Sequence, residues 1–525
     1  MTRRLLPPGK VPWEVIAPHL EAQLPPEVEL GPACGEDAAL VRIGGKLWAV
    51  ASDPVSFTSH GAGRLAVLVN ANDISVRGAR PALMTVVVLI APGEADEVRT
   101  GALLDEIAAG CRRLGVTVIG GHTEVTPGIG HTIVVGTMLG PVEGRAIVTG
   151  GLTPGDRIGL VGWAGLEGTH ILLARFGERL TARLTTAERE QVRTVLAGEW
   201  LSIVAPALAA AAVPGVSALH DVTEGGIGEA LHELGTASGC EIDADPAGIP
   251  VLGATRRICR LLGLDPLGLI GSGALLIGCH ASSQPALEAA LAQLDLPIAW
   301  IGVCREGEPG CAGIPRFPRD ELLRIDVFDH IRAVLLDMDG TLIESSYDWP
   351  AIRHKLGVEA PSLIDGIEAL PDGDRRRAWA ELESIERAAT ATATLKPGAH
   401  RLLEALATRG IATALVTNNT SANTSALLDR FGLRFDTVVT RDSGLYKPSG
   451  APLIEACARL GTSPANCLAV GDSHYDIEAA RDAGCGAVCI VDEPAAGPKA
   501  ELVLPGIAAL AELVEIVLPP PSAVP

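Results

Sequence analysis

The sequence predicts a multidomain α/β protein, with two α+β subdomains followed by a doubly wound α/β domain that carries a small helical cap. The 525 residues suffice for about three or four domains. Hydrophobic residues make up 47% of the chain and charged residues 20%, which is typical of folded rather than disordered proteins. Toward the carboxyl end, short apolar runs alternate with segments of helical periodicity, as in a parallel sheet covered on both faces.

Turn-rich segments indicate where the domains meet. The sequence GGLTPGD at 150–156 separates a subdomain over 1–150 from one over 151–305. Several prolines and glycines then predict a linker over 306–330, because neither a helix nor a central strand tolerates them. The doubly wound domain follows over 331–518, and the proline-rich residues 519–525 are expected to form a disordered tail.

The amino-terminal half shows longer apolar segments than the rest of the chain. Three runs rich in β-branched residues predict strands, at Leu65–Asn70, Leu83–Ile90 and His131–Met138. Apolar residues at helical spacing predict a helix over 102–114. A further short strand is expected over Val116–Ile119, directly before Gly120 and Gly121.

In the carboxyl-terminal domain, three buried strands are expected at Ala333–Leu336, Thr413–Val416 and Cys467–Val470. Helices are expected over 398–409, 449–460 and 476–483. Asp337, Thr417 and Asp472 each follow closely on one of the strands. Ligands of open α/β sheets bind beyond the carboxyl ends of the strands, so we expect these three side chains to converge.

The segment AVLLDMDGTLIES, residues 333–345, places Asp337 and Asp339 two residues apart beyond a buried strand. Paired carboxylates in this position can share a hard cation such as Mg²⁺. A carboxylate can also attack phosphorus and form an aspartyl-phosphate. A lone D-x-D or K-P pair is usually only a turn. Phosphoryl-transfer chemistry is favoured here because several such features occur in order along this part of the chain.

These motifs resemble those of the haloacid dehalogenase superfamily, whose four motifs occur here in order: DMDGT at 337–341, Thr417 after ALV, Lys447 in YKPSG, and GDSHYD at 471–476. The resemblance implies a Rossmann-like hydrolase domain. It also implies that Asp337 is the nucleophile and Asp339 the general acid and base, and that Thr417 and Lys447 bind the phosphoryl group. Asp337, Asp339 and Asp472 would hold Mg²⁺, with Asp476 supporting Lys447 or the outer metal shell. The aspartate at 339 favours a phosphatase over a dehalogenase.

About 50 residues between the first two motifs, at 346–395, predict a helical cap. Its apolar spacing is carried by Ala378, Trp379, Leu382 and Ile385. A cap excludes water and selects substrate, and a short one favours a small phosphorylated metabolite. The run Arg375–Arg377 is expected to be a solvated helix face rather than a substrate clamp. The superfamily resemblance implies phosphoglycolate-like molecules as the default substrates.

The amino-terminal half contains three aspartates beside small residues, namely Asp37, Asp53 and Asp73. Glycine-rich segments occur at 120–124 (GGHTE), 162–170, 220–230 (HDVTEGGIGEA) and 269–276. Glycines let a backbone approach phosphate, and carboxylates hold the Mg²⁺ that accompanies a nucleotide. Each feature alone is more often a turn or a helix cap.

Together they resemble the aminoimidazole ribonucleotide synthetase-like superfamily over about residues 10–305, and the hydrogenase-maturation branch most closely. The resemblance implies a synthetase-like homodimer that binds ATP, with Mg²⁺ held by Asp37 and Asp73. The nucleotide site would comprise Asp37, Asp53, Asp73, Gly120, Gly121, Asp221, Gly225 and Gly226. His122 stands where the thiamine-monophosphate kinase pattern has an aspartate. The maturation enzyme carries its substrate group on a carboxyl-terminal cysteine, whereas this chain ends in PSAVP, so cyanide formation is not expected.

Composition excludes several other functions. A net charge of −21 argues against broad nucleic-acid or anionic-membrane surfaces, which need excess Lys and Arg. Eleven scattered cysteines without a C-x-x-C pair indicate reduced, mostly buried thiols, and Cys34 is expected in the core. The first residues lack the apolar stretch of a secretion signal, so a soluble cytoplasmic protein is expected.

The sequence thus predicts a fusion of a Mg²⁺-dependent phosphatase with an ATP-binding synthetase-like module. Two alternatives concern the amino-terminal half. It is either the main enzyme, an ATP-dependent maturation factor of synthetase or kinase type, or a nucleotide-sensing dimerisation module without catalysis.

Overall fold

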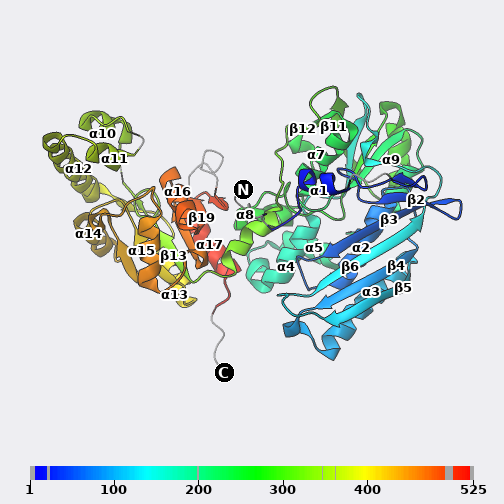
Figure 1. Ribbon diagram of the computed structural model, residues 1–525, viewed down its shortest axis with the longest axis horizontal. Helices are drawn as coiled ribbons and strands as arrows, with labels where there is room; N and C mark the ends of the chain where they lie inside the picture. Colours follow the sequence, from blue (N-terminus) through cyan, green and yellow to red (C-terminus); the bar gives the residue numbers. More distant parts are fainter. Residues whose placement is uncertain are drawn as a thin grey trace. The chain divides into compact units, whose positions relative to one another are not determined.

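The computed structural model describes residues 6, 8–20, 24–197, 200–345, 347–360, 362–490 and 500–520, and it confirms the multidomain α/β fold (Figure 1). The chain divides into an amino-terminal unit, Met1–Arg260 with Leu264–Leu323, and a carboxyl-terminal unit, Leu261–Gly263 with Arg324–Pro525. Within the described residues, no helix combines the length and the apolar character needed to cross a bilayer. The predicted disordered tail lies outside the described residues from position 521 onward.

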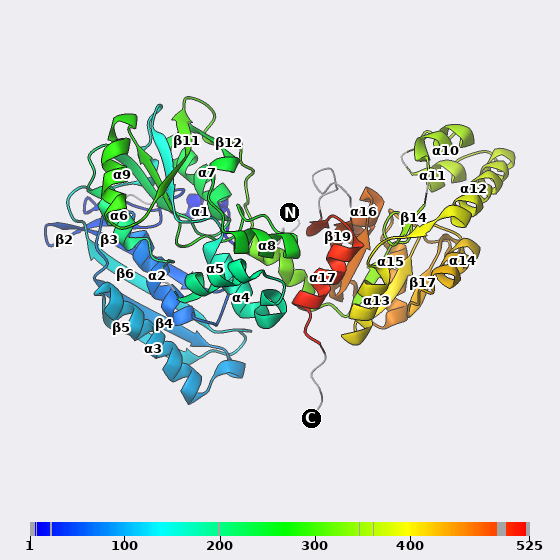
Figure 2. The same cartoon turned by 180° about the vertical axis from the view of Figure 1, so that it is seen from behind.

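The first sheet of the amino-terminal unit has the strand order β1-β2-β3-β6-β4-β5. Its strands are β1 (Val28–Leu30), β2 (Ala39–Ile43), β3 (Lys46–Val55), β4 (Leu83–Ile90), β5 (Thr117–Val125) and β6 (Ile133–Pro141). The helices of this region are α1 (Trp13–Leu20), α2 (Ala62–Ser75) and α3 (Glu97–Leu114). Figure 2 shows α2 and α3, which contact each other, across one face of this sheet.

The strand predicted over Leu65–Asn70 is wrong, because these residues lie within α2. Almost every residue of α2 is buried, since the helix packs between the sheet and α3. A helix that is buried all round shows no 3.6-residue periodicity, so an apolar run of this length does not distinguish it from a buried strand. In β4, by contrast, alternate side chains are buried, as expected for a strand with one face in the core.

Strand β5 forms one edge of this sheet and is exposed at all nine positions. It pairs with β4 alone, in parallel, and the register shifts between Met84 and Thr85. A Cβ on Gly121 would lie 1.9 Å from the Val86 carbonyl oxygen, so glycine is required for the close approach of the two strands. Gly120 and Gly121 therefore belong to this strand, not to a turn beyond it.

The second sheet of this unit has the order β12-β9-β11-β7-β10-β8. Its strands are β7 (Arg157–Val161), β8 (Val216–Asp221), β9 (Glu241–Ala244), β10 (Leu275–Cys279), β11 (Ile298–Arg305) and β12 (Gly310–Ala312). Its helices are α4 (Leu166–Thr181), α5 (Thr186–Ala197), α6 (Val204–Ala211), α7 (Gly226–Ser238), α8 (Gly253–Leu262) and α9 (Gln284–Ala292). The predicted linker at 306–330 differs from an open connector, since it contains β12 and the 3-10 helix η5 (Glu321–Phe328).

The carboxyl-terminal unit contains a parallel sheet of order β17-β16-β13-β18-β19-β20. The strands are β13 (Ala333–Leu336), β16 (Ala412–Val416), β17 (Thr437–Val439), β18 (Cys467–Gly471), β19 (Gly486–Ile490) and β20 (Leu502–Leu504). The helices are α13 (Ala399–Thr408), α14 (Ser421–Phe431), α15 (Ala451–Leu460), α16 (His474–Ala483) and α17 (Ile507–Val517). Every residue of β13 and β18 is buried, because helices cover both faces.

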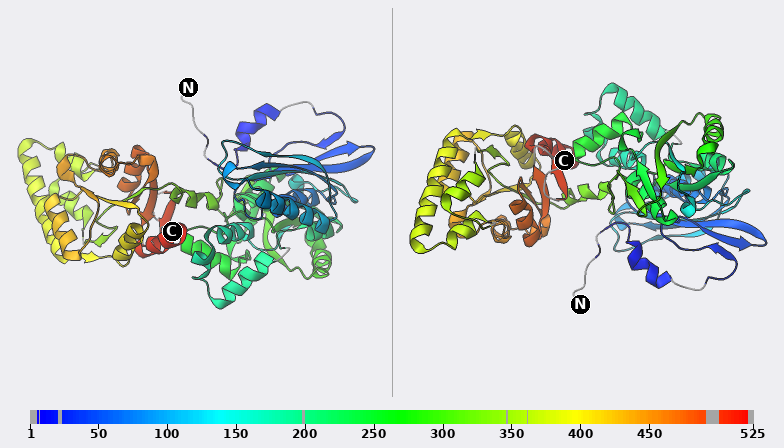
Figure 3. Two further views of the ribbon diagram at one scale, coloured as in Figure 1. Left: turned by 90° about the horizontal axis from the view of Figure 1, so that it is seen from below. Right: turned by 90° about the horizontal axis from the view of Figure 1, so that it is seen from above.

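A helical segment is inserted after the first strand of this unit. It consists of α10 (Trp349–Leu356), α11 (Leu363–Glu368) and α12 (Asp372–Thr392), and a two-stranded ribbon of β14 (Ile343–Glu344) and β15 (Thr394–Leu395) forms its stem. It has an apolar core of its own, which includes Ile352, Ile367 and Leu382. Figure 1 shows α10, α11 and α12 as a group above α14 and α15, and Figure 3 shows these helices in yellow-green from two further sides. We call this segment the cap.

Candidate functional sites

The carboxyl ends of three neighbouring strands bring the predicted phosphatase residues together. Asp337 follows β13, Thr417 follows β16 and Asp472 follows β18. The backbone N–H of Asp337 donates to Val470 (2.9 Å), and that of Thr417 donates to Val439 (3.0 Å). The backbone hydrogen bonds of the sheet thus extend to Asp337 and Thr417 and hold the main chain of both residues in place. A cavity of about 410 Å³ lies there, lined by Asp337, Asp339, Thr417, Lys447, Asp472 and Asp476 among others.

Lys447 lies between two buried carboxylates. Its Nζ is 2.5 Å from Asp337 Oδ1 and 2.5 Å from Asp476 Oδ1. Burial alone would lower the pKa of Lys447, but the charges of the two aspartates outweigh it and raise that pKa, so the lysine stays positive. Asp476 is held in turn by Ser473, whose hydroxyl donates to its Oδ2 (2.6 Å) at the start of α16.

One group of carboxylates in this site could hold a metal ion. Asp337, Asp472 and Asp476 offer oxygens within 4.8 Å of one another. Burial raises the pKa of Asp337, which Lys447 opposes, and burial together with Asp476 raises the pKa of Asp472 to about 6. Gly340 leaves room for this group, since a Cβ there, at φ +88°, would lie 2.2 Å from Asp472 Oδ2. Two buried carboxylates and one half-buried carboxylate against one lysine fit a divalent cation.

Asp339 lies apart from that carboxylate group and has different partners. Ser345 Oγ donates to its Oδ1 (2.7 Å), and Asn419 Nδ2 donates to its Oδ2 (3.0 Å). Burial raises the pKa of Asp339. A raised pKa suits a carboxyl group that must hold a proton before donating it. Of the metal ligands expected from sequence, the carboxylates of Asp337 and Asp472 are thus grouped, with Asp476 in place of Asp339.

Sequence reasoning missed several residues of this site. Asn419 holds Asp339, and Arg441 pairs with Glu386 of α12, with Arg441 Nη2 2.7 Å from Glu386 Oε2. Glu386 is 4% exposed, so this ion pair between cap and core is desolvated. Asn419 follows two positions after Thr417, so its place beside a motif residue could have revealed it. No local signal marks Arg441 or Glu386.

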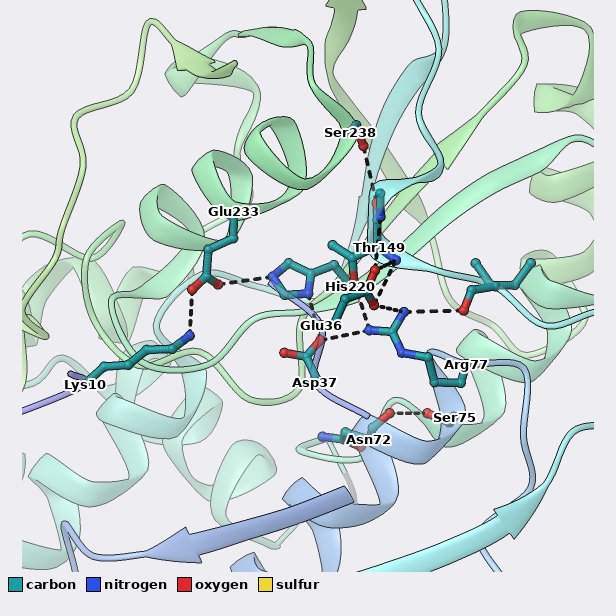
Figure 4. A network of polar contacts seen from close by, with 12 residues as sticks. Lys10, Glu36, Asp37, Asn72, Ser75, Arg77, Thr149, His220, Glu233 and Ser238 are labelled. Atoms are coloured by element: carbon teal, nitrogen blue, oxygen red, sulfur yellow. Dashed lines mark hydrogen bonds and ion pairs between the residues drawn. The ribbon is translucent and has the colours of Figure 1, made fainter. Parts of the chain in front are cut away.

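The amino-terminal unit contains a second network, built around Asp37 and His220 (Figure 4). Asp37 Oδ2 is 2.9 Å from His220 Nδ1 and 3.3 Å from Arg77 Nη2. His220 Nε2 lies 3.3 Å from Glu233 Oε2, and Lys10 Nζ lies 2.6 Å from Glu233 Oε1. Burial would lower the pKa of His220, but Asp37 more than offsets it and raises that pKa to about 10. Burial likewise opposes ionisation of Asp37, but His220 and Arg77 lower its pKa to about 2.

Asp73 of α2 and Asp221 at the end of β8 lie beside this network without partners. Both are 1% exposed, and none of their four carboxylate oxygens has a hydrogen-bond partner in the described structure. Burial, with the nearby aspartates, raises the pKa of Asp73 well above its ordinary value and that of Asp221 to about 8. Asp221 also groups with Asp37 and His220 within metal-binding distance. Buried carboxylates without donors fit a cation as the missing partner.

The remaining residues predicted for the nucleotide site are placed differently. Asp53 lies on β3 beside Asp37, and burial raises its pKa to about 6. Gly225 and Gly226 begin α7, and their N–H groups donate to Asp320 (2.8 Å) and Thr223 (3.1 Å). Gly120 and Gly121 lie on β5, so the structure does not bring them to the buried aspartates within this chain.

A cavity of about 750 Å³ adjoins these residues, lined by Lys10, Asp37, Asp53, Glu224 and Gly225 among others. Cys34 also lines it and is half-buried, so the expectation of a core cysteine is wrong. Cys34 sits in a loop beside Glu233, not in the interior of a sheet, and burial raises the pKa of its thiol. Lys10, Glu233 and Arg77 were missed from sequence, because their contacts join distant segments.

Family models match three regions of the chain. Residues 35–142 match the AIR synthase related protein N-terminal domain, and residues 153–310 match the corresponding C-terminal domain. Residues 331–484 match the haloacid dehalogenase-like hydrolase family. The first two matches cover most of the two sheets of the amino-terminal unit. The third covers the cap and strands β13, β16, β17 and β18 of the parallel sheet.

Individual proteins are similar to parts of the chain. Carbamoyl dehydratase HypE of Cupriavidus necator is 33% identical over 243 residues, which cover 45% of this chain and 65% of that protein. Phosphoglycolate phosphatase of Nitrosospira multiformis is 34% identical over 188 residues, which cover 30% of this chain and 83% of that protein. The crystal structure of E. coli HypE, a hydrogenase maturation protein, is 25% identical, with a TM-score of 0.44, and covers 51% of this chain and 84% of that chain.

Proposed function

We propose that this chain is a Mg²⁺-dependent phosphatase of small phosphomonoesters fused to an ATP-binding module. Its amino-terminal half belongs to the AIR synthase-related family, and its carboxyl-terminal half belongs to the haloacid dehalogenase-like hydrolase family. The reaction would follow the same chemistry as in the phosphoglycolate phosphatase that this half resembles. The position of Lys447 between Asp337 and Asp476, on the wall of a capped cavity, carries this proposal.

In the proposed reaction, Asp337 is the nucleophile. A carboxylate oxygen of Asp337 attacks phosphorus, and the bond from phosphorus to the ester oxygen breaks. The leaving oxygen keeps the electron pair and takes the proton that Asp339 holds. Water then attacks the aspartyl-phosphate and gives its proton to Asp339, which releases phosphate and restores Asp337. Lys447 and Thr417 orient the phosphoryl oxygens, and the Lys447 charge stabilises the negative charge that builds on them.

Asp337 and Asp472 would hold Mg²⁺, with the backbone of the 337–341 turn beside them and Asp476 engaged with Lys447. When bound, the cation neutralises the phosphoryl oxygens and the clustered carboxylates. The fit rests on charge: Asp337, Asp472 and Asp476 face one lysine in a buried site, which leaves negative charge without a counterion.

A panel of phosphomonoesters tests the phosphatase. We expect phosphate release from at least one ester in MgCl₂, and a fall of about a hundredfold or more in EDTA, because several kcal/mol of charge stabilisation is withdrawn. Restoring Mg²⁺ should restore the rate. Undiminished hydrolysis in EDTA would contradict the metal site, and no hydrolysis of any ester would contradict the proposal as a whole.

For the amino-terminal half, we propose binding of ATP with Mg²⁺ in the cavity beside Asp37 and Asp53. Asp37 and Asp73 would hold the cation, and the orphaned carboxylates of Asp73 and Asp221 support this assignment. Gly225 and Gly226 would lie near the phosphates. ATP would either activate a group in a synthetase or kinase reaction or be sensed without catalysis.

We further propose that the amino-terminal halves form a homodimer through the β5 edge. This strand exposes Val118, Ile119 and Val125, at 43%, 55% and 54%, together with its unpaired backbone edge. Sheet edges of this length and polarity are normally covered in folded proteins. A second copy of β5 would cover the apolar side chains and bring Gly120 and Gly121 into an interface.

Two measurements on the full chain test the proposals of ATP binding and of a homodimer. Calorimetric titration with ATP in MgCl₂ should show saturable binding, and sedimentation in the same buffer should show a species of twice the 54.2 kDa mass. Substrate-dependent ADP formation would identify a synthetase or kinase, whereas tight binding with slow turnover would identify a nucleotide sensor. The absence of binding, or a sedimenting monomer, contradicts the corresponding proposal.

A further inference from the structure

Two pairs of aromatic rings line the cavity of the carboxyl-terminal unit. Tyr347 and Trp349 of the cap are stacked, with ring centroids 4.6 Å apart and planes inclined by 27°. His474 and Tyr475, at the start of α16, have centroids 4.0 Å apart and planes inclined by 36°. The chain contains few aromatic residues, only 3% of the total, so two pairs in one cavity are a local concentration.

A hydrogen bond joins the helix that carries Trp349 to one ring of the other pair. Trp349 and Arg353 are four residues apart on α10, so their side chains share a face of the helix. Arg353 Nη2 lies 3.1 Å from the Tyr475 hydroxyl. One ring pair belongs to the cap and the other to the sheet domain, and Arg353 links the elements that carry them.

The cap rings lie on the side of the leaving group. Asn419 Nδ2 donates to Asp339 Oδ2 (3.0 Å) and lies 3.5 Å from the Tyr347 hydroxyl. Asp339 is the residue that protonates the leaving oxygen in the proposed reaction. In that reaction the carbon attached to the oxygen would lie on the side of Tyr347, and the rest of the leaving alcohol would extend toward Trp349.

Trp349 has space for a partner. Its side chain is 44% exposed although it borders a cavity whose other lining includes Leu363, Ile364 and Leu382. Tyr347 covers one side of the indole. An aromatic ring that is open to a partly apolar cavity of about 410 Å³ gains both burial and stacking when a planar group enters.

We propose that this active site selects phosphomonoesters whose alcohol carries a planar aromatic ring. The ring packs against Trp349 and Tyr347, and the phosphoryl group reaches Asp337 and Lys447. This inference rests on the proposed phosphatase activity and narrows its substrate class. Glycolate has no ring to place against the indole.

A matched pair of substrates tests the inference. Benzyl phosphate and cyclohexylmethyl phosphate have leaving alcohols of similar size and similar basicity, but only the first has an aromatic ring. We expect kcat/KM for benzyl phosphate to be about tenfold higher with the wild-type chain, as stacking geometry predicts, and 2-phosphoglycolate to be poorer than both. Equal values for the benzyl and cyclohexylmethyl esters would overturn the inference while leaving the phosphatase proposal intact.

Variants identify the residue responsible. Trp349→Leu should reduce the ratio of the two kcat/KM values to about one, whereas Trp349→Phe should keep most of it. His354→Ala is the matched control, because His354 lies on the same helix, is exposed and does not line the cavity. A ratio that survives Trp349→Leu would overturn the role of the indole. Loss of all ester hydrolysis in the wild type would instead contradict the phosphatase itself.

Discussion

Phosphate release falls by at least about a thousandfold when Asp337 is replaced by Asn, because the amide is neutral and cannot replace the carboxylate as nucleophile. The substitution preserves the size of the side chain, and its oxygen can still accept from Lys447. Initial rates on the best ester of the panel, in saturating MgCl₂, measure the effect. Rapid acid quenching with a labelled ester should also show a phosphorylated wild-type chain and an unlabelled variant.

The fold of this variant is expected to remain intact. Replacing Asp337 with the neutral amide removes one negative charge from the group that it forms with Asp472 and Asp476, and Lys447 keeps its contact with Asp476. The thermal unfolding temperature should therefore not fall. Asp429→Asn is a matched control, since that side chain is 73% exposed, and it should retain the wild-type rate. A variant at position 337 that kept more than about one hundredth of the rate would rule out Asp337 as the nucleophile.

Asp221→Asn is expected to stabilise the amino-terminal unit in metal-free buffer at pH 8, by several kcal/mol. Asp221 has a folded-state pKa of about 8 against an ordinary value of 3.8. Between these values the folded state binds more protons than the unfolded state, so the free energy of unfolding falls as the pH rises. The pKa of His220, which is raised from 6.5 to about 10, adds to this fall in the free energy of unfolding. The stabilisation that protonated His220 provides is complete below pH 6.5 and is lost as the pH rises through about 10.

Urea denaturation at pH 5 and pH 8 in EDTA measures this effect, followed by tryptophan fluorescence. Five of the seven tryptophans lie in the amino-terminal unit, so the signal reports mainly on it. The wild type should lose stability between the two pH values, and the variant should lose less. With Mg²⁺ and ATP the wild type should gain more stability than the variant, because the Asp221 carboxylate adds negative charge beside the cation that Asp37 and Asp73 would hold. Equal pH dependence in both proteins would contradict the raised pKa of Asp221.

The sequence predicted the carboxyl-terminal unit more accurately than the amino-terminal one. Strand β13 was placed to the residue, because four fully buried apolar residues followed by Asp337 leave little choice of structure. Leu65–Asn70 was mistaken for a strand, since burial on every side of α2 removes the periodicity that identifies a helix. Gly121 looked like part of a turn, but it serves the close packing of β5 on β4.

The residues of a candidate site could be predicted from the sequence where they belong to short motifs. Asp337, Thr417, Lys447 and Asp472 do meet in one cavity, because parallel strands end at the same edge. The pairing of Glu233 with both Lys10 and His220 joins segments more than 200 residues apart in one case, and no sequence pattern encodes it. The separation of Asp339 from the carboxylate group depends on Asn419 and Ser345, which position it from a loop and from the stem of the cap.

The ion pair of Glu386 and Arg441 holds the cap against the rest of the carboxyl-terminal unit. It joins helix α12 to the segment after β17, and both side chains are almost fully buried. For the cap to swing open, both charges must separate and become hydrated, and dissolved salt screens a buried pair only weakly. In the proposed phosphatase, we therefore expect this ion pair to slow cap opening and the departure of phosphate more than the cleavage of the ester. Turnover would then be limited by cap opening, and ionic strength would have little influence on it.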